Sequence, residues 1–112
     1  MAKKSQSNFR EWKDYLVEKL RDPEEAMAYL QVAIEEYQND HHLDALLLAL
    51  DNIAKAQPGG MTALARRTSM SRQNLYKALS EGGNPRLETF DQILHGLGYR
   101  MSIEPLDHHT GA

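Results

Sequence analysis

The chain has 112 residues, 41% of them hydrophobic, which is enough for one domain with a modest core and short extensions. It has no cysteine, which excludes disulfides and thiolate metal sites and fits a reducing, cytoplasmic setting. The N-terminal residues lack the apolar run of a signal peptide, and no stretch approaches the ~20 apolar residues of a membrane span. We therefore expect a cytoplasmic protein without membrane contact.

The net charge of −3 conceals a strong segregation of charge along the chain. Residues 1–60 carry seven basic and eleven acidic side chains, and residues 87–112 carry one basic and four acidic ones. Residues 61–86 instead carry five basic side chains and one acidic one. Because phosphate binding depends on local charge, the middle block is suited to nucleic acid. The acidic first half is suited to a basic partner.

The N-terminal half has the apolar spacing of amphipathic helices. After residues 1–8, which are polar and predicted to be disordered, one helix follows and a second begins at Asp22-Pro23, where an aspartate cap precedes proline. A break at residues 39–42 precedes a third helix, which ends before residues 58–60. We assign residues 9–42 to an N-terminal helical extension that binds a partner.

Residues 61–80, MTALARRTSMSRQNLYKALS, have the spacing of a helix-turn-helix. Small or apolar residues occupy the positions where two short helices must pack at a tight turn: Leu64, Ala65, Thr68, Met70, Leu75 and Ala78. Ser71 is a candidate N-cap of the second helix, and Ser69 occupies the turn position that usually holds glycine. We predict a helix-turn-helix within a DNA-binding domain spanning residues 43–98. The alternative is an ordinary helical hairpin in a core.

This interpretation predicts which side chains meet DNA, because the N-terminal part of the second helix of the motif enters the major groove. Arg72 and Lys77 have donors for guanine, and Gln73 and Asn74 suit the adenine edge. Four residues outside that helix are placed for phosphate contacts: Arg66, Arg67, Asn84 and Arg86. For each residue the alternative is a solvated surface side chain.

A short C-terminal strand is predicted over residues 99–106, after one more helix that ends at Gly98. Apolar and polar residues alternate there with a period of two, until Pro105 stops the pattern. No second strand is evident, so we expect this strand to pair with another chain, either a copy of itself or a different protein. The alternative is an irregular tail on its own domain. Residues 107–112 are expected to be a flexible tail.

Aromatic side chains in the acidic half are candidates for binding a partner protein: Trp12, Tyr15, Tyr29 and Tyr37. Aromatic anchors dominate interface energies, and neighbouring acids would steer a basic partner. The alternating residues of the C-terminal segment are candidates for a dimer seam or for the same partner: Tyr99, Met101 and Ile103. The alternative is that Trp12 and the tyrosines complete the core while the acids solvate the surface.

The histidines do not have the spacing of a metal site. His41-His42 and His108-His109 are adjacent pairs, without the separation of four residues that places two ligands on one helix face. No Ser-His-Asp or Cys-His arrangement is evident either. We expect no metal, no cofactor and no enzyme activity.

The pieces SRQNLYKALS, EGGNP and LGYRMSIEP, in this order and spacing, resemble the family of probable addiction module antidote proteins. These are HigA-like antitoxins with a repressor-type helix-turn-helix, and the resemblance covers roughly residues 12–106. It implies neutralisation of a small basic RelE-type ribonuclease toxin and repression of the chain's own operon at an operator in double-stranded DNA. The recognition-helix positions of the family carry over to Ser71, Arg72, Gln73, Tyr76 and Lys77.

The expected fold is therefore mainly α: a helix-turn-helix domain, an N-terminal helical extension and one strand that pairs between chains. A homodimer is expected, because two helix-turn-helix units read half-sites about one DNA turn apart. The first alternative is a stand-alone phage-type repressor without a toxin partner. The second is an interaction protein whose helix-turn-helix no longer binds DNA.

Overall fold

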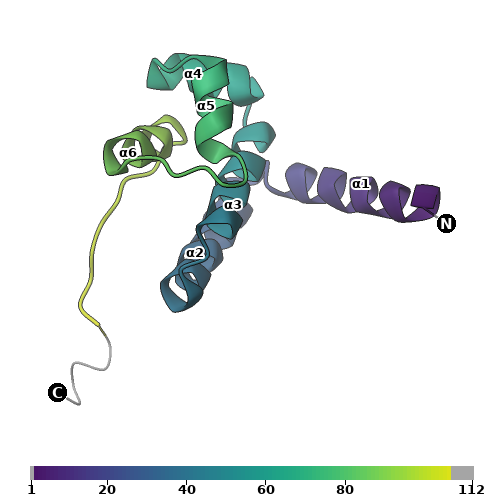
Figure 1. The fold of residues 1–112 in the computed structure, drawn as a ribbon, viewed down its shortest axis with the longest axis horizontal. Helices are drawn as coiled ribbons and strands as arrows, with labels where there is room; N and C mark the ends of the chain where they lie inside the picture. Colours follow the sequence, from purple (N-terminus) through teal and green to yellow (C-terminus); the bar gives the residue numbers. More distant parts are fainter. Residues whose placement is uncertain (1, 107–112) are drawn as a thin grey trace.

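The computed structural model describes residues 2–106, which contain six helices and no strand. The helices are α1 (Ala2–Lys19), α2 (Pro23–Asp40), α3 (Leu43–Ala56), α4 (Gly60–Thr68), α5 (Arg72–Leu79) and α6 (Leu87–Gly96). Helices α2 and α3 lie side by side, α4, α5 and α6 gather around one end of this pair, and α1 projects away from it (Figure 1). The predicted mainly helical fold is confirmed.

Local signals set both ends of α2: its start is the predicted one, whereas the helix continues to Asp40, into the break predicted over residues 39–42. The carboxylate of Asp22 accepts a hydrogen bond of 2.9 Å from the Glu24 N–H, and Pro23 opens the helix without leaving a donor unpaired. The helix ends where His41 takes a left-handed conformation, with φ 57°, and its N–H bonds the Tyr37 carbonyl. Contacts within four residues along the chain therefore set both ends of this helix.

Helix α3 is the centre of the core. It contacts α1, α2, α4 and α5, and Leu47, Leu50 and Ile53 are completely buried. Each of the last three helices adds one fully buried side chain to the same cluster: Leu64, Leu75 and Ile93. The cluster also includes Leu20, Ala26 and Leu30 from the N-terminal part of the chain. The N-terminal helices and the helix-turn-helix thus share one core, which fixes the position of α5.

The two ends of the described chain differ from expectation. Residues 2–8, predicted to be disordered, are the first part of α1; they contain neither glycine nor proline, and Ala, Lys and Gln favour helix. The predicted strand over residues 99–106 is wrong for the single chain, in which this segment is irregular. A strand needs a second strand to bond with, and the described residues provide none. The predicted flexible tail lies outside the described residues.

No helix in residues 2–106 is long and apolar enough to cross a membrane.

Candidate nucleic-acid interface

The turn between α4 and α5 closes tightly without a glycine. Ser69 takes the left-handed conformation, with φ 61°, and the Met70 N–H donates to the Ala65 carbonyl at 3.1 Å. The Thr68 hydroxyl donates to the same carbonyl at 3.0 Å and accepts from the Met70 N–H at 3.3 Å. These bonds satisfy the last carbonyls of α4 and hold a conformation that costs a non-glycine residue free energy. The arrangement has the form of the predicted helix-turn-helix.

Ser71 caps the N-terminus of α5, as predicted. Its Oγ accepts a hydrogen bond of 3.0 Å from the Asn74 N–H, and its own backbone is extended. The cap fixes where the helix begins and therefore which residues occupy its first turn. The remaining N–H groups of that turn are left pointing outward, where the helix dipole favours a phosphate.

Replacing Ser71 with alanine is expected to lower the free energy of unfolding by about 1 kcal/mol, because one N–H of α5 loses its acceptor. Urea unfolding followed by circular dichroism measures the change. Ser80→Ala is the matched control, since its hydroxyl only donates to the Lys77 carbonyl at the exposed end of the same helix. Equal losses for the two variants would contradict a specific role of the cap.

Helix α5 has one buried and one exposed face. Leu75 and Leu79 are buried, whereas the candidate DNA-contacting residues are exposed: Arg72, Gln73, Asn74, Tyr76 and Lys77. The helix contains no acidic residue, so its charged groups are all positive. The exposed face thus presents cationic and amide groups together, which is the chemistry that reads base edges in the major groove.

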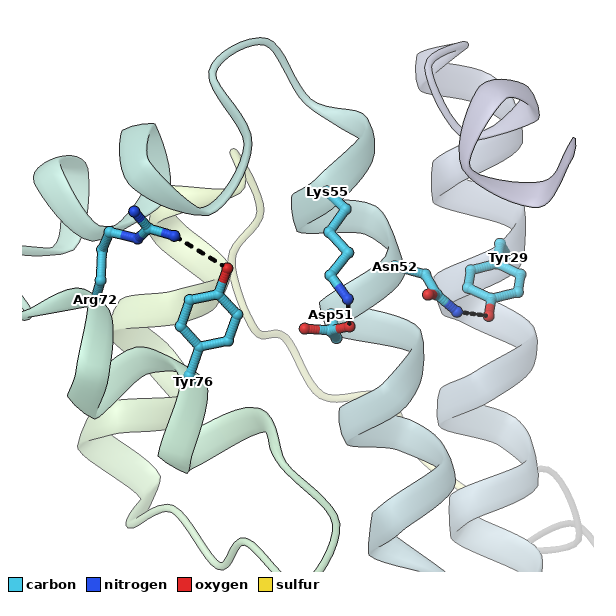
Figure 2. Close-up of polar contacts among 6 residues, drawn as sticks. All are labelled: Tyr29, Asp51, Asn52, Lys55, Arg72 and Tyr76. Atoms are coloured by element: carbon cyan, nitrogen blue, oxygen red, sulfur yellow. Dashed lines mark hydrogen bonds and ion pairs between the residues drawn. The ribbon is translucent and has the colours of Figure 1, made fainter. Parts of the chain in front are cut away.

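Arg72 and Tyr76 form a pair one turn apart on this face (Figure 2). The guanidinium carbon of Arg72 lies 5.6 Å from the centre of the Tyr76 ring, and the Arg72 Nη2 donates to the tyrosine hydroxyl at 3.3 Å. A cation over an aromatic face is attracted by the ring quadrupole. Tyr76 therefore restrains the direction of the Arg72 side chain, which is a role that the sequence did not indicate.

The two arginines of α4 have different surroundings. Arg66 is exposed, while Arg67 donates from Nε to the Gly96 carbonyl at 2.7 Å and from Nη2 to the Gln57 Oε1 at 3.0 Å. Gln57 in turn donates to the Leu97 carbonyl at 3.0 Å. Arg67 thus joins α4 to the ends of α3 and α6. Its positive charge is also attracted by the negative C-terminal end of the α6 dipole. A phosphate would have to compete with these bonds, a constraint that sequence spacing does not reveal.

The loop after α5 is tied to the start of α3. The Gly82 N–H donates to the Asp44 carboxylate at 2.9 Å, a contact between residues 38 positions apart that the sequence analysis missed. A Cβ on Gly83 would lie 2.6 Å from the Ala78 carbonyl oxygen, so the next position excludes a side chain. The loop therefore has a defined path, along which Asn84 and Arg86 are exposed beyond the end of α5.

A family model described as probable addiction module antidote protein matches residues 12–105 of this chain. The chain belongs to this family. The chain is also 33% identical, over 93 residues, to an uncharacterised protein of Haemophilus influenzae (strain ATCC 51907 / DSM 11121 / KW20 / Rd). That alignment covers 82% of this chain and 90% of the relative. No solved structure gives a significant match. Membership of an antidote family implies a toxin partner, whose type the family description leaves open.

The structure separates the aromatic residues that were candidates for partner binding. Trp12 and Tyr15 are 60% and 58% exposed on α1, with ring centres 5.9 Å apart. Tyr29 and Tyr37 are half-buried against the core, and the Tyr29 hydroxyl accepts a bond of 3.2 Å from the buried Asn52 (Figure 2). Of these four aromatic candidates, only Trp12 and Tyr15 therefore have most of their surface in solvent.

The three C-terminal candidates for partner binding also differ in burial. Tyr99 packs against the core, where burial raises the pKa of its phenol above the usual 10.0. Met101 and Ile103 are exposed. Tyr99 therefore fixes the start of this segment on the domain, and the next alternate residues are left available for contact.

Proposed function

We propose that this chain is the antitoxin of a type II toxin–antitoxin pair, which neutralises a RelE-type ribonuclease toxin by direct binding and represses its own operon. The homodimer, acting in the cytoplasm as a HigA-like autorepressor, binds an operator in double-stranded DNA. The observation that carries the DNA-binding part is the first turn of α5. This turn is capped by Ser71, is exposed and contains no acidic residue. The ring of Tyr76 restrains the direction of its Arg72 side chain.

The outer face of α1 supports the toxin-binding part of the proposal. Trp12 and Tyr15 expose a large aromatic area that the fold of this chain leaves uncovered. Large exposed aromatic side chains are typical anchors of protein interfaces, and they lie in the half of the chain with an excess of acid. A small basic toxin suits both properties.

The proposal is tested by purifying the tagged chain from cells that express its native locus. We expect a small basic protein, encoded beside it, to be recovered in stoichiometric amount and to lose its ribonuclease activity in the complex. The same preparation should retard the duplex that lies upstream of the operon. Recovery of the chain alone, as a homodimer that still binds this duplex, would instead support a stand-alone phage-type repressor. Absence of any retardation at low salt would contradict the repressor role.

Replacing Arg86 with alanine is expected to weaken binding equally for the upstream duplex and for an unrelated duplex of the same length. Arg86 lies in the loop beyond α5, where we assign it to a phosphate, and a phosphate contact carries no sequence information. The slope of log K against log salt should fall by about 1. Arg10→Ala, which removes the same charge from exposed α1, is the control and should leave the slope unchanged. A loss confined to the upstream duplex would contradict the phosphate assignment.

A further inference from the structure

Residues 100–105 leave the domain as an extended segment (Figure 1). Much of the apolar surface of this segment lies in solvent. The side chain of Ile103 is 99% exposed and that of Met101 is 43% exposed. Within the part of the chain that the structure describes, no backbone hydrogen bond joins residues 100–105 to other residues. Unpaired backbone groups beside exposed alternate apolar side chains are the properties of a strand that lacks its neighbour.

The start of this segment is anchored to the domain. Gly98, with φ 96°, lies two residues beyond the end of α6, and the Tyr99 N–H donates to the Leu94 carbonyl at 2.8 Å. Met101 then lines a shallow groove together with Leu87, which is 72% exposed at the first position of α6. The segment therefore leaves the core at a fixed point, with apolar surface of α6 beside it.

The sequence of the segment is complementary to itself in one antiparallel register. When Ser102 is placed opposite Ser102 of a second copy, Arg100 lies opposite Glu104, and Met101 lies opposite Ile103. Each copy supplies one residue to every pair, and the two-fold axis repeats each pair, which gives two opposite-charge pairs on one face and two apolar pairs on the other. Opposite charges and apolar pairs directly across from each other stabilise a ladder.

Neighbouring registers lose this match. Shifting the axis to Ile103 places Arg100 opposite Leu106 and Glu104 opposite Ser102, so both charge pairs are lost. The two registers whose axis lies between residues place polar Ser102 opposite apolar Met101 or apolar Ile103, so polar and apolar side chains share a face. The charge and apolar patterns therefore agree on the Ser102 axis.

Pro105 is also compatible with this register. If the Ser102 pair exchanges backbone hydrogen bonds, then the Arg100 and Glu104 pairs do so too, because bonded pairs alternate along an antiparallel ladder. Pro105, opposite Tyr99, then occupies a non-bonded position whose N–H would point away from the partner strand. The ribbon therefore loses no hydrogen bond at Pro105. Because proline has no N–H to offer on the outer edge, it also hinders the addition of a third strand.

We propose that residues 99–105 of two copies of this chain pair as an antiparallel two-stranded ribbon centred on Ser102. The ribbon covers Met101 and Ile103 of both copies and joins two helix-turn-helix units. The inference rests on the homodimer within the proposed function and adds the surface that forms it. The other candidate occupant, the sheet edge of a toxin, is an outcome of the test.

Cysteine crosslinking reads the register directly, because the natural chain has no cysteine. In a bonded antiparallel pair, opposite Cα atoms are about 5.5 Å apart, within the range of a disulfide. Oxidised Ser102→Cys protein should therefore run almost entirely as a covalent dimer. In Glu104→Cys protein, the cysteine of each copy faces Arg100 of the other copy. The two cysteines are then four residues apart along the ribbon, about 14 Å, and should not form a disulfide. Analytical ultracentrifugation before oxidation establishes the oligomeric state of each variant.

Charge reversal supplies a second measurement on the full chain. Arg100→Glu alone and Glu104→Arg alone place like charges opposite each other twice per dimer and should each raise the dimer dissociation constant at least about tenfold. Mixing the two variants restores opposite pairs, so a heterodimer should form with near-native affinity. If the charges acted without facing each other in this register, mixing the two variants would not restore the affinity of the dimer.

The outcomes separate this inference from the proposed function. A dimer in which Ser102→Cys does not crosslink, or crosslinking of Glu104→Cys instead, overturns the ribbon while leaving the dimer intact. A monomeric chain whose Ser102→Cys form crosslinks only to a co-purified toxin assigns the segment to the toxin and overturns the ribbon. Toxin recovery and retardation of the upstream duplex are measured independently, so the antitoxin proposal survives either result.

Discussion

Replacing Arg72 with alanine is expected to weaken binding to the upstream duplex by about 5- to 150-fold, which corresponds to about 1–3 kcal/mol. The reason is that Arg72 lies in the first turn of α5, exposed and directed by Tyr76, where a guanidinium can donate two hydrogen bonds to one guanine. The loss should be concentrated on the upstream duplex. Binding to an unrelated duplex should fall only by the contribution of one positive charge.

Competition binding at two salt concentrations, with both duplexes and a set of single base-pair changes, provides the measurement. Arg86→Ala is the matched control, since it removes the same charge from the neighbouring loop. Preference at one base-pair position should relax in the Arg72 variant and persist in the Arg86 variant. Equal losses on all sequences for both variants would assign Arg72 to a phosphate.

The contribution of Tyr76 can be separated in the same assay. Tyr76→Phe keeps the ring beneath the guanidinium and removes only the hydroxyl that accepts from Arg72 at 3.3 Å. Its specificity should lie between those of the natural chain and the Arg72 variant. Specificity below that of the Arg72 variant would show that Tyr76 itself contacts DNA, rather than acting through Arg72.

Replacing Gly96 with valine is expected to lower the free energy of unfolding by about 3 kcal/mol. A Cβ at this position would lie 2.7 Å from both the Leu64 Cδ1 and the Thr68 Cγ2 on α4. Neither side chain has room to move, because Leu64 is fully buried and Thr68 is held by two hydrogen bonds of the turn. The added atoms would push α6 away from the first helix of the helix-turn-helix.

Thermal and urea unfolding measure the loss, with Gln92→Val as control, because Gln92 lies one turn earlier on the same helix and is exposed. The milder Gly96→Ala variant tests the cause through a double substitution. Thr68→Ser removes the methyl group in the way and keeps the hydroxyl that bonds the turn. The double variant Thr68→Ser with Gly96→Ala should lose less free energy of unfolding than the sum of the losses of the two single variants. Simple additivity would show that the close approach to Thr68 is not the cause.

The shared core links this stability prediction to function. Gly96 also presents the carbonyl that accepts from Arg67 at 2.7 Å, so the α4–α6 contact includes close packing and a charged hydrogen bond at one point. Displacing α6 would loosen α4 and, through the tight turn at Ser69, the direction of α5. Gly96→Val should therefore reduce DNA binding at temperatures where the chain is still folded.

Local chemistry in the sequence determined the helices and the motif. The Asp22-Pro23 start of α2 and the Ser71 cap of α5 act between residues at most three positions apart, so the chain encodes them wherever it folds. The small and apolar residues at helix-turn-helix spacing, with the basic block around them, predicted the exposed cationic face of α5. The family match over residues 12–105 agrees with the resemblance seen in the same stretches.

Tertiary structure alone decided which polar and aromatic side chains face solvent. Arg67 bonds Gly96 across 29 positions and Asp44 bonds Gly82 across 38, and no spacing rule relates residues so far apart. In the sequence, Tyr29 and Trp12 are equal candidates for an exposed aromatic surface. In the structure, Tyr29 packs beside Asn52 and Trp12 is exposed, because the packing of the helices determines which side chains are covered. Residues 99–106 show the same principle between chains, since alternation predicts a strand but an unpaired strand cannot form until a second strand supplies its hydrogen bonds.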